Sequence, residues 1–104
     1  AGCMLIDRRL SEIMRIDENT KFSSTFTACR ELVNLTVDGV IGQNGFDIHW
    51  STKLTHESLM SIINALADKS GTGTTFTITL GTENLAKLTD AEKAIATQKG
   101  WSFG

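Results

Sequence analysis

The stretch Phe46-Asp47-Ile48-His49-Trp50 alternates strictly between apolar and polar side chains. Successive side chains of a β-strand point to opposite faces, so this alternation predicts a half-buried strand. Phe46, Ile48 and Trp50 are expected to face the core. Asp47 and His49 are then expected on the opposite, solvated face, with His49 beside Asp47 or a threonine.

Residues 75–80 predict a second strand of the same kind. Its apolar residues, Phe76, Ile78 and Leu80, follow those of 46–50 at a distance of 30 positions. Thr77 and Thr79 fall on the other face, where β-branched polar side chains suit a solvated sheet surface. The recurrence of this apolar pattern after 30 residues indicates repeated structural units.

Two helices are expected around the second strand. Apolar residues at i, i+3, i+4 and i+7 predict a helix over about 55–69, with Thr55 as its N-cap and Gly71 just past its end. A second helix is expected over about 90–99, because Thr89 and Glu92 have the spacing of a capping box. Gly100 should terminate it, and 101–103 should form a last strand.

Apolar residues recur at a regular spacing in the first third of the chain. Leu10 and Leu32 lie 22 positions apart, as do Ile13 and Leu35. A repeat of this length with apolar residues at fixed offsets is typical of a solenoid, in which each unit supplies a short strand and a connection to the next. We expect one sheet with strands near Ile13, Leu35, Ile48, Ile78 and Ser102. Between the repeats and the strand at 46–50, the step Asn44-Gly45 favours a hairpin turn.

Composition narrows the function classes. The 104 residues suffice for one domain, and the net charge of −2 provides no basic stripe to neutralise phosphates. We therefore expect no nucleic-acid partner. No apolar run approaches the ~18 residues of a membrane span, so no membrane insertion is expected. The start of the chain lacks the basic region and apolar core of a signal peptide, which leaves its location open.

Cys3 and Cys29 are the only cysteines of the chain. They could pair, but one pair is not a disulfide framework. We expect two small buried hydrophobic residues instead.

The sequence contains no recognisable group of catalytic or metal-binding residues. His49 and His56 are the only histidines, and no Cys-x-x-Cys or His-Glu-x-x-His motif accompanies them. His56 is expected to be exposed in a first helical turn. Residues 71–75 are glycine-rich but precede a strand, which is not the arrangement of a phosphate-binding loop. No Gly-x-Ser-x-Gly motif surrounds a serine, including the polar cluster at 23–25. We expect a non-enzymatic protein with no cofactor and no metal.

Two further features have alternative interpretations. Trp50 and Trp101 could be binding hot spots, but their positions favour core packing. Asn34-Leu35-Thr36 matches the N-glycosylation pattern. With Leu35 in the core, Asn34 and Thr36 should lie on the outer face of a strand.

Three stretches have a pattern in common with a known family. They are Phe26-x-x-Cys29-x-x-Leu32-x-x-Leu35-x-Val37, residues 54–66 and residues 85–101. These stretches resemble the bacterial surface leucine-rich-repeat proteins of the BspA-like class. The family usually carries Ile-Pro after its strand, whereas Ile16 is followed by Asp17 here. The resemblance implies a right-handed solenoid with a parallel sheet on one face, and a role in adhesion, host-surface binding or a virion-like structure. It implies no catalytic residues.

The sequence predicts a single α/β domain over 1–104. Together with the resemblance, it implies a leucine-rich-repeat-like right-handed solenoid fragment with short parallel strands and covering helices. Degenerate repeats are expected over about 10–53 and a helix–strand–helix C-terminal cap over about 54–104. The expected function is adhesion or protein–protein interaction at an extracellular or cell-surface location. The alternative is a structural module of a prophage-type or surface assembly, which could associate with itself through an open N-terminal repeat. The expected protein-contact surface consists of Asn34, Thr36, Asp47, His49, Thr77 and Thr79.

Overall fold

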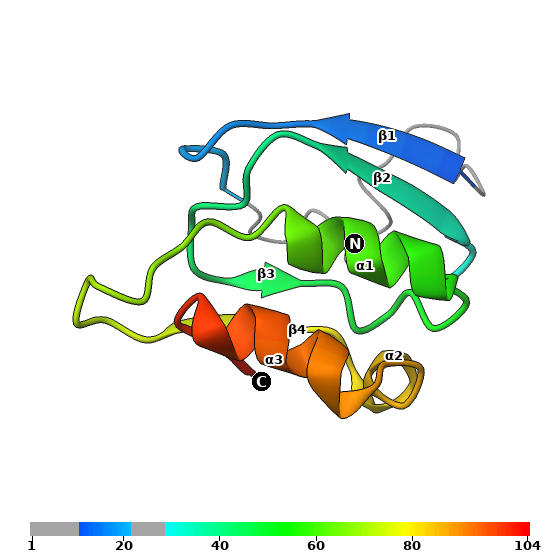
Figure 1. Cartoon of the computed structure of the whole chain (residues 1–104). Helices are drawn as coiled ribbons and strands as arrows, with labels where there is room; N and C mark the ends of the chain where they lie inside the picture. The colour runs from blue at the N-terminus through cyan, green and yellow to red at the C-terminus, as the bar shows by residue number, and fades with distance from the viewer. Residues whose placement is uncertain (1–10, 22–28) are drawn as a thin grey trace.

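The computed structural model describes residues 11–21 and 29–104. Every strand pair within these residues is parallel. β1 and β2 form one sheet, which lies along one side of the molecule (Figure 1). β3, β4 and β5 form a second sheet in that order. In chain order the elements are β1 (Ser11–Arg15), β2 (Asn34–Asp38), β3 (Phe46–Asp47), α1 (His56–Asn64), β4 (Phe76–Thr79), α2 (Thr82–Leu85), α3 (Asp90–Gln98) and β5 (Trp101–Phe103).

The two longer helices lie side by side on one side of the strands (Figure 1). α1 contacts both β2 and α3, and α3 also contacts β5. This is a mixed α/β arrangement with parallel strands in two sheets. The parallel strands and the covering helices agree with the expectation from sequence, whereas the single continuous sheet does not.

The first sheet pairs its strands one residue away from the register that the 22-residue echo suggested. Ser11 pairs with Asn34 and Ile13 pairs with Thr36, so the paired residues are 23 positions apart. A shift of one residue moves a side chain to the other face of a strand. Leu35 is therefore buried, as expected, but Ile13 is 54% exposed. The 22-residue spacing between Ile13 and Leu35 is therefore not the register of this sheet.

The second sheet also departs from its sequence echo, but by an even number of residues. Phe46 pairs with Ile78, 32 positions away, where the echo of 30 matched it with Phe76. A shift of two residues leaves each side chain on the same face of its strand. Phe46 and Ile78 are therefore both buried in the core, as expected. β3 is shorter than the predicted strand: it ends at Asp47, and the chain turns at positions 49 and 50.

The core gathers the inward side chains of both sheets and the apolar stripe of α1. Its fully buried members come from nearly every described element, which explains how such short strands are held in place. The largest of them are Trp101, Phe46, Leu32, Leu35, Ile41, Ile48, Leu54, Leu59, Ile62, Ile63 and Ile78.

α1 begins where the sequence predicts and ends earlier. The hydroxyl of Thr55 accepts a hydrogen bond from the backbone nitrogen of Ser58, which confirms Thr55 as the N-cap. The helix ends at Asn64 because the chain leaves it to form a parallel bridge between Leu66 and Ile41. The predicted continuation to residue 69, with Gly71 as its terminating glycine, is therefore wrong.

The C-terminal part follows the prediction more closely. Thr89 and Glu92 form a complete capping box at the start of α3. Gly100 has a φ of 87° and ends the helix before β5, as expected. The short helix α2 had no signal in the sequence analysis.

Asn44 and Gly45 do not form the predicted hairpin turn, because β2 and β3 belong to different sheets. The side-chain oxygen of Asn44 instead accepts hydrogen bonds from the backbone nitrogens of Gly45 and Thr77. The side chain of Asn44 thus links the segment before β3 to β4 by a hydrogen bond.

Candidate binding surface

The side of the β3–β4–β5 sheet opposite the core is lined by short polar side chains. Asp47 pairs with Thr79 and Thr77 pairs with Ser102, and paired residues of neighbouring strands share a face. The hydroxyls of Thr77 and Ser102 lie 3.5 Å apart. We call Asp47, His49, Thr77, Thr79 and Ser102 the threonine face. His49 is exposed, and the other members are partly buried.

Asp47 and His49 form a fixed pair within the threonine face. One carboxylate oxygen of Asp47, Oδ1, accepts a hydrogen bond from the backbone nitrogen of His49 at 3.1 Å and lies 2.6 Å from its ring nitrogen Nδ1. A carboxylate can only accept, so Nδ1 carries the hydrogen and Nε2 of the neutral ring is an acceptor. The expectation that His49 lies beside Asp47 is confirmed.

Trp50 does not lie in the core, and the prediction of core packing is wrong for this residue. It is partly exposed, and its ring stacks on the ring of His49 with centroids 3.8 Å apart and planes inclined by 30°. The cause is the turn at positions 49 and 50, which ends the strand alternation before Trp50 is reached. Trp101, in contrast, is buried as predicted, and its indole nitrogen donates to the carbonyl of Ala67.

Gly81 at the end of β4 accommodates His49. A Cβ atom at position 81 would lie 3.0 Å from the Cβ of His49, and Gly81 has φ 93° and ψ 155°. This backbone region is essentially restricted to glycine. Gly81 therefore lets β4 end directly beside His49.

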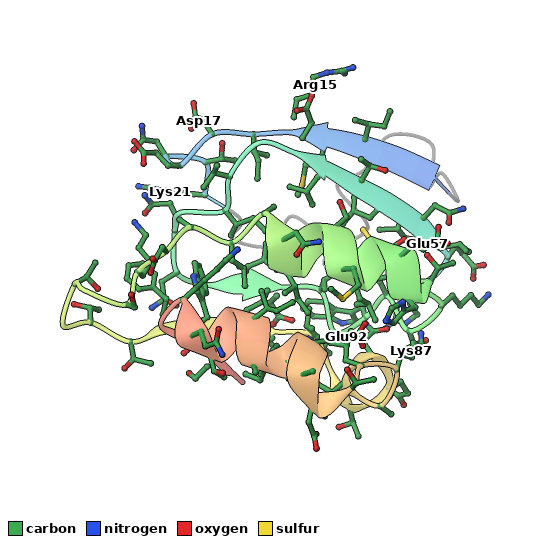
Figure 2. The ribbon with its side chains drawn as sticks, in the orientation of Figure 1. Arg15, Asp17, Lys21, Glu57, Lys87 and Glu92 are labelled. Atoms are coloured by element: carbon green, nitrogen blue, oxygen red, sulfur yellow. The ribbon has the colours of Figure 1, made fainter. Side chains whose placement is uncertain are left out.

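Asn34 and Thr36 belong to a different sheet from the other four predicted contact residues. Both are exposed on β2, flanking the buried Leu35, which agrees with the outward orientation expected for the glycosylation-like triplet. Their paired residues on β1 are Ser11 and Ile13. Arg15 pairs with Asp38 at the end of the same strands, and their side chains approach to 3.7 Å. Figure 2 shows Arg15 directed away from the molecule above β1. The structure thus divides the predicted surface into two groups.

A buried polar cluster was missed by the sequence analysis. Asn84 is fully buried, and its amide nitrogen donates to the carbonyls of Ser51 and Leu80. The ammonium of Lys87 donates to Asn84 and to the carbonyls of Thr52 and Leu54. The donors are satisfied by backbone carbonyls of the protein itself, so this cluster fastens loops together. A lone asparagine in a short unpredicted helix gives no signal of this in the sequence.

His56 is exposed, as predicted, and contacts a residue far along the chain. Its Nε2 lies 2.6 Å from a carboxylate oxygen of Glu92, at the start of α3. The backbone N–H of Thr89, aided by His56 and by the hydroxyl of Thr89, lowers the pKa of the Glu92 carboxyl. Figure 2 shows Glu92 and Lys87 at the same end of the molecule, near the start of α1.

Cys29 is buried at 3% exposure, as expected, but it is disulfide-bonded. The expectation of two unpaired small hydrophobic residues is therefore wrong for Cys29. Cys3 lies outside the described residues, as do Leu10, Phe26 and the serines of the 23–25 cluster.

The described residues lack two further features. No three side chains of His, Cys, Asp or Glu type come together there in a way that could hold a metal ion. None of the helices seen there has the length and apolar character that crossing a membrane requires.

No family model matches the chain, and no curated protein or solved structure matches it either.

Proposed function

We propose that this protein is a non-enzymatic binding module of a bacterial surface protein, similar to the BspA-like leucine-rich-repeat class, and that it mediates adhesion or protein–protein interaction. The observation that carries the proposal is the threonine face. Its side chains are short, polar and clustered on the side of the sheet away from the core. Repeat proteins commonly use the exposed side of their sheet for binding.

The architecture supports a solenoid interpretation as part of this proposal. Within each sheet, the paired residues of neighbouring strands are 23, 32 and 25 positions apart, as Ser11–Asn34, Phe46–Ile78 and Phe76–Trp101 show. Parallel pairing at intervals of this length is what repeats of strand plus connection produce. The unequal lengths agree with repeats that have degenerated in sequence.

The disulfide at Cys29 supports an extracellular or cell-surface location. Disulfides form and persist in oxidising surroundings and are rare in the cytosol. A thiol count on the denatured, unreduced protein checks this: no free thiol is expected, and two free thiols would remove this support.

Biolayer interferometry against a defined panel tests the binding proposal. The panel holds extracellular-matrix proteins, mucin, bacterial cell wall and the chain itself. The test variant is Thr77→Lys combined with Thr79→Lys, which places two long cations on the threonine face. The matched control is Thr97→Lys, at an exposed position of α3. Saturable binding that the double variant loses and the control keeps supports the proposal, whereas equal binding by both variants contradicts it.

The alternative function, a structural module of a surface or prophage-type assembly, has one observation in its favour. β1 pairs only with β2 among the described strands, and Ile13 on its outward face is 54% exposed. Exposed sheet edges pair readily with other chains. Self-association in the same panel, lost on Ile13→Lys, would favour this alternative, and binding of a foreign partner without self-association would contradict it.

A further inference from the structure

The threonine face ends at a cluster whose chemistry defines a ligand class. Asp47, His49, Trp50 and Thr79 come together where β3 and β4 end, and we call them the Trp50 cluster. Asp47 is paired with Thr79, and the ring of Trp50 stacks on that of His49. In parallel sheets, ligands bind characteristically beyond the carboxyl ends of the strands.

We propose that the Trp50 cluster binds a neutral glycan through the indole of Trp50 and the acceptors of Asp47 and His49. This inference rests on the proposed binding function and names the ligand class of the same surface.

The hydrogen-bonding groups of the cluster are those that sugar hydroxyls need. Oδ1 of Asp47 is occupied by His49, but Oδ2 makes no hydrogen bond in the described part of the chain. In the neutral form of the His49 ring, Nε2 is a second acceptor, since Nδ1 holds the hydrogen that points to Asp47. The hydroxyl of Thr79 both donates and accepts. A sugar hydroxyl also donates and accepts, so sugar hydroxyls can form a hydrogen bond with each of these three groups.

The aromatic group supplies the apolar part of such a site. The face of an indole carries negative charge density, and the C–H face of a pyranose ring presents slightly positive hydrogens. Trp50 is partly exposed, and contact with His49 restricts its orientation. A side chain that is ordered before binding loses little entropy when a ligand stacks on it.

Charge distinguishes this ligand class from others. The cluster contains no lysine or arginine, and the chain has a net charge of −2, so phosphates and acidic polymers are disfavoured. A basic side chain is the competing ligand, because a carboxylate and an indole can hold a cation. The glycan is favoured because half of the Asp47 carboxylate is already engaged by two N–H groups, while the rest of the face offers uncharged hydroxyls.

Indole N–H signals in nuclear magnetic resonance spectra of the full chain test the inference. The two tryptophans give two such signals. Trp101 is buried, and its N–H is bonded to Ala67, so its signal is an internal control for folding. The probes are lactose, maltotriose and chitotriose as neutral glycans, and a tri-lysine peptide as a cation. We expect at least one glycan to shift the Trp50 signal saturably and leave the Trp101 signal unchanged.

Variants then assign the contact. Trp50→Phe keeps an aromatic ring and is expected to weaken glycan binding several-fold, and Asp47→Asn to weaken it by about tenfold. Thr97→Lys on α3 is expected to bind like the wild type. A Trp50 signal that responds to tri-lysine alone, or to none of the probes, overturns the glycan inference. The proposed binding function is judged separately, because loss of a protein partner on Thr77→Lys and Thr79→Lys would still support it.

Discussion

The hydroxyl oxygen of Ser58 on α1 lies 2.9 Å from the backbone nitrogen of Leu35 and accepts its hydrogen bond. The same hydroxyl donates to the carbonyl of Val33, and Ser61, one turn later, accepts from the backbone nitrogen of Val37. Two serines of α1 therefore make hydrogen bonds to the backbone groups on the edge of β2 that faces away from β1. They do what a neighbouring strand would do, and this is why the two sheets are separate.

Replacing Ser58 with alanine should therefore destabilise the fold. The backbone N–H of Leu35 would be left buried without its acceptor, which costs about 1–3 kcal/mol of unfolding free energy. The carbonyl of Val33 would keep its hydrogen bond from the backbone N–H of Thr55. Ser61→Ala is the matched control and should cost less, because Val37 is only partly buried and water can replace the serine. Denaturant titration measures both values. Equal stability of Ser58→Ala and the wild type would contradict this view of the β2 edge.

Asn84 should be as sensitive to substitution as Ser58. Asn84→Ala removes the donors to the carbonyls of Ser51 and Leu80 and the acceptor for Lys87. We expect a loss of about 2–3 kcal/mol in thermal or denaturant unfolding. Asn64→Ala, at an exposed position near the end of α1, should change stability by less than about 0.5 kcal/mol. A similar small effect at Asn84 would show that the buried cluster does not hold the loops.

Gly81→Ala should cost stability and also disturb His49. The φ of 93° disfavours any side chain, by about 1–3 kcal/mol, and the new methyl group would press on His49. Gly71→Ala is the control, since a Cβ there meets nothing within 4 Å. Unfolding curves, together with the histidine signals in the magnetic resonance spectrum, provide the readout. An unchanged His49 signal in a destabilised Gly81→Ala variant would contradict the predicted contact.

Acid should weaken the fold in part through Glu92. Its pKa in the folded protein is lowered below the ordinary value of 4.5, first by the backbone N–H of Thr89. A lowered folded pKa gives stability that is fully present above the unfolded pKa and is lost as the pH falls through the folded value. Glu92→Gln keeps an acceptor for the capping box but cannot titrate. The difference in melting temperature between wild type and this variant should therefore shrink below about pH 4.5. A difference that stays constant from neutral to acid pH would contradict this assignment.

The elements that sequence predicted well are those whose signals are local. The capping box of Thr89 and Glu92, the N-cap Thr55 and the terminating Gly100 each depend on residues within a few positions. The alternation of Phe76, Thr77 and Ile78 likewise depends on the strand alone. These signals were sufficient to place α3, the start of α1, β4 and β5.

Pairing between strands was not predictable in the same way, because register depends on residues far apart. A spacing of 22 residues matched Ile13 with the buried Leu35, whereas the strands pair at 23 positions and Ile13 is exposed. An error of two residues in the register between β3 and β4 left the predicted buried faces of both strands correct. Trp50 was misplaced because a turn, and not an extended strand, follows Ile48.

The candidate surface was predictable only in part, for the same reason. The alternation within each strand placed Asp47, Thr77 and Thr79 on one face, and the two-residue separation placed His49 beside Asp47. Strand alternation says nothing about which sheet a strand joins, so Asn34 and Thr36 were grouped with residues of the other sheet. The stacking of Trp50 on His49 follows from the turn and had no signal in the alternation.

A map of the ligand contact is the decisive measurement for the binding role. Backbone amide signals of the full chain are recorded while the panel component that binds is added. The proposal predicts that the largest shifts occur at Asp47, His49, Thr77 and Thr79, with small shifts along α1 and α3. Largest shifts on the two helices, or no saturable shift with any panel component, would contradict it.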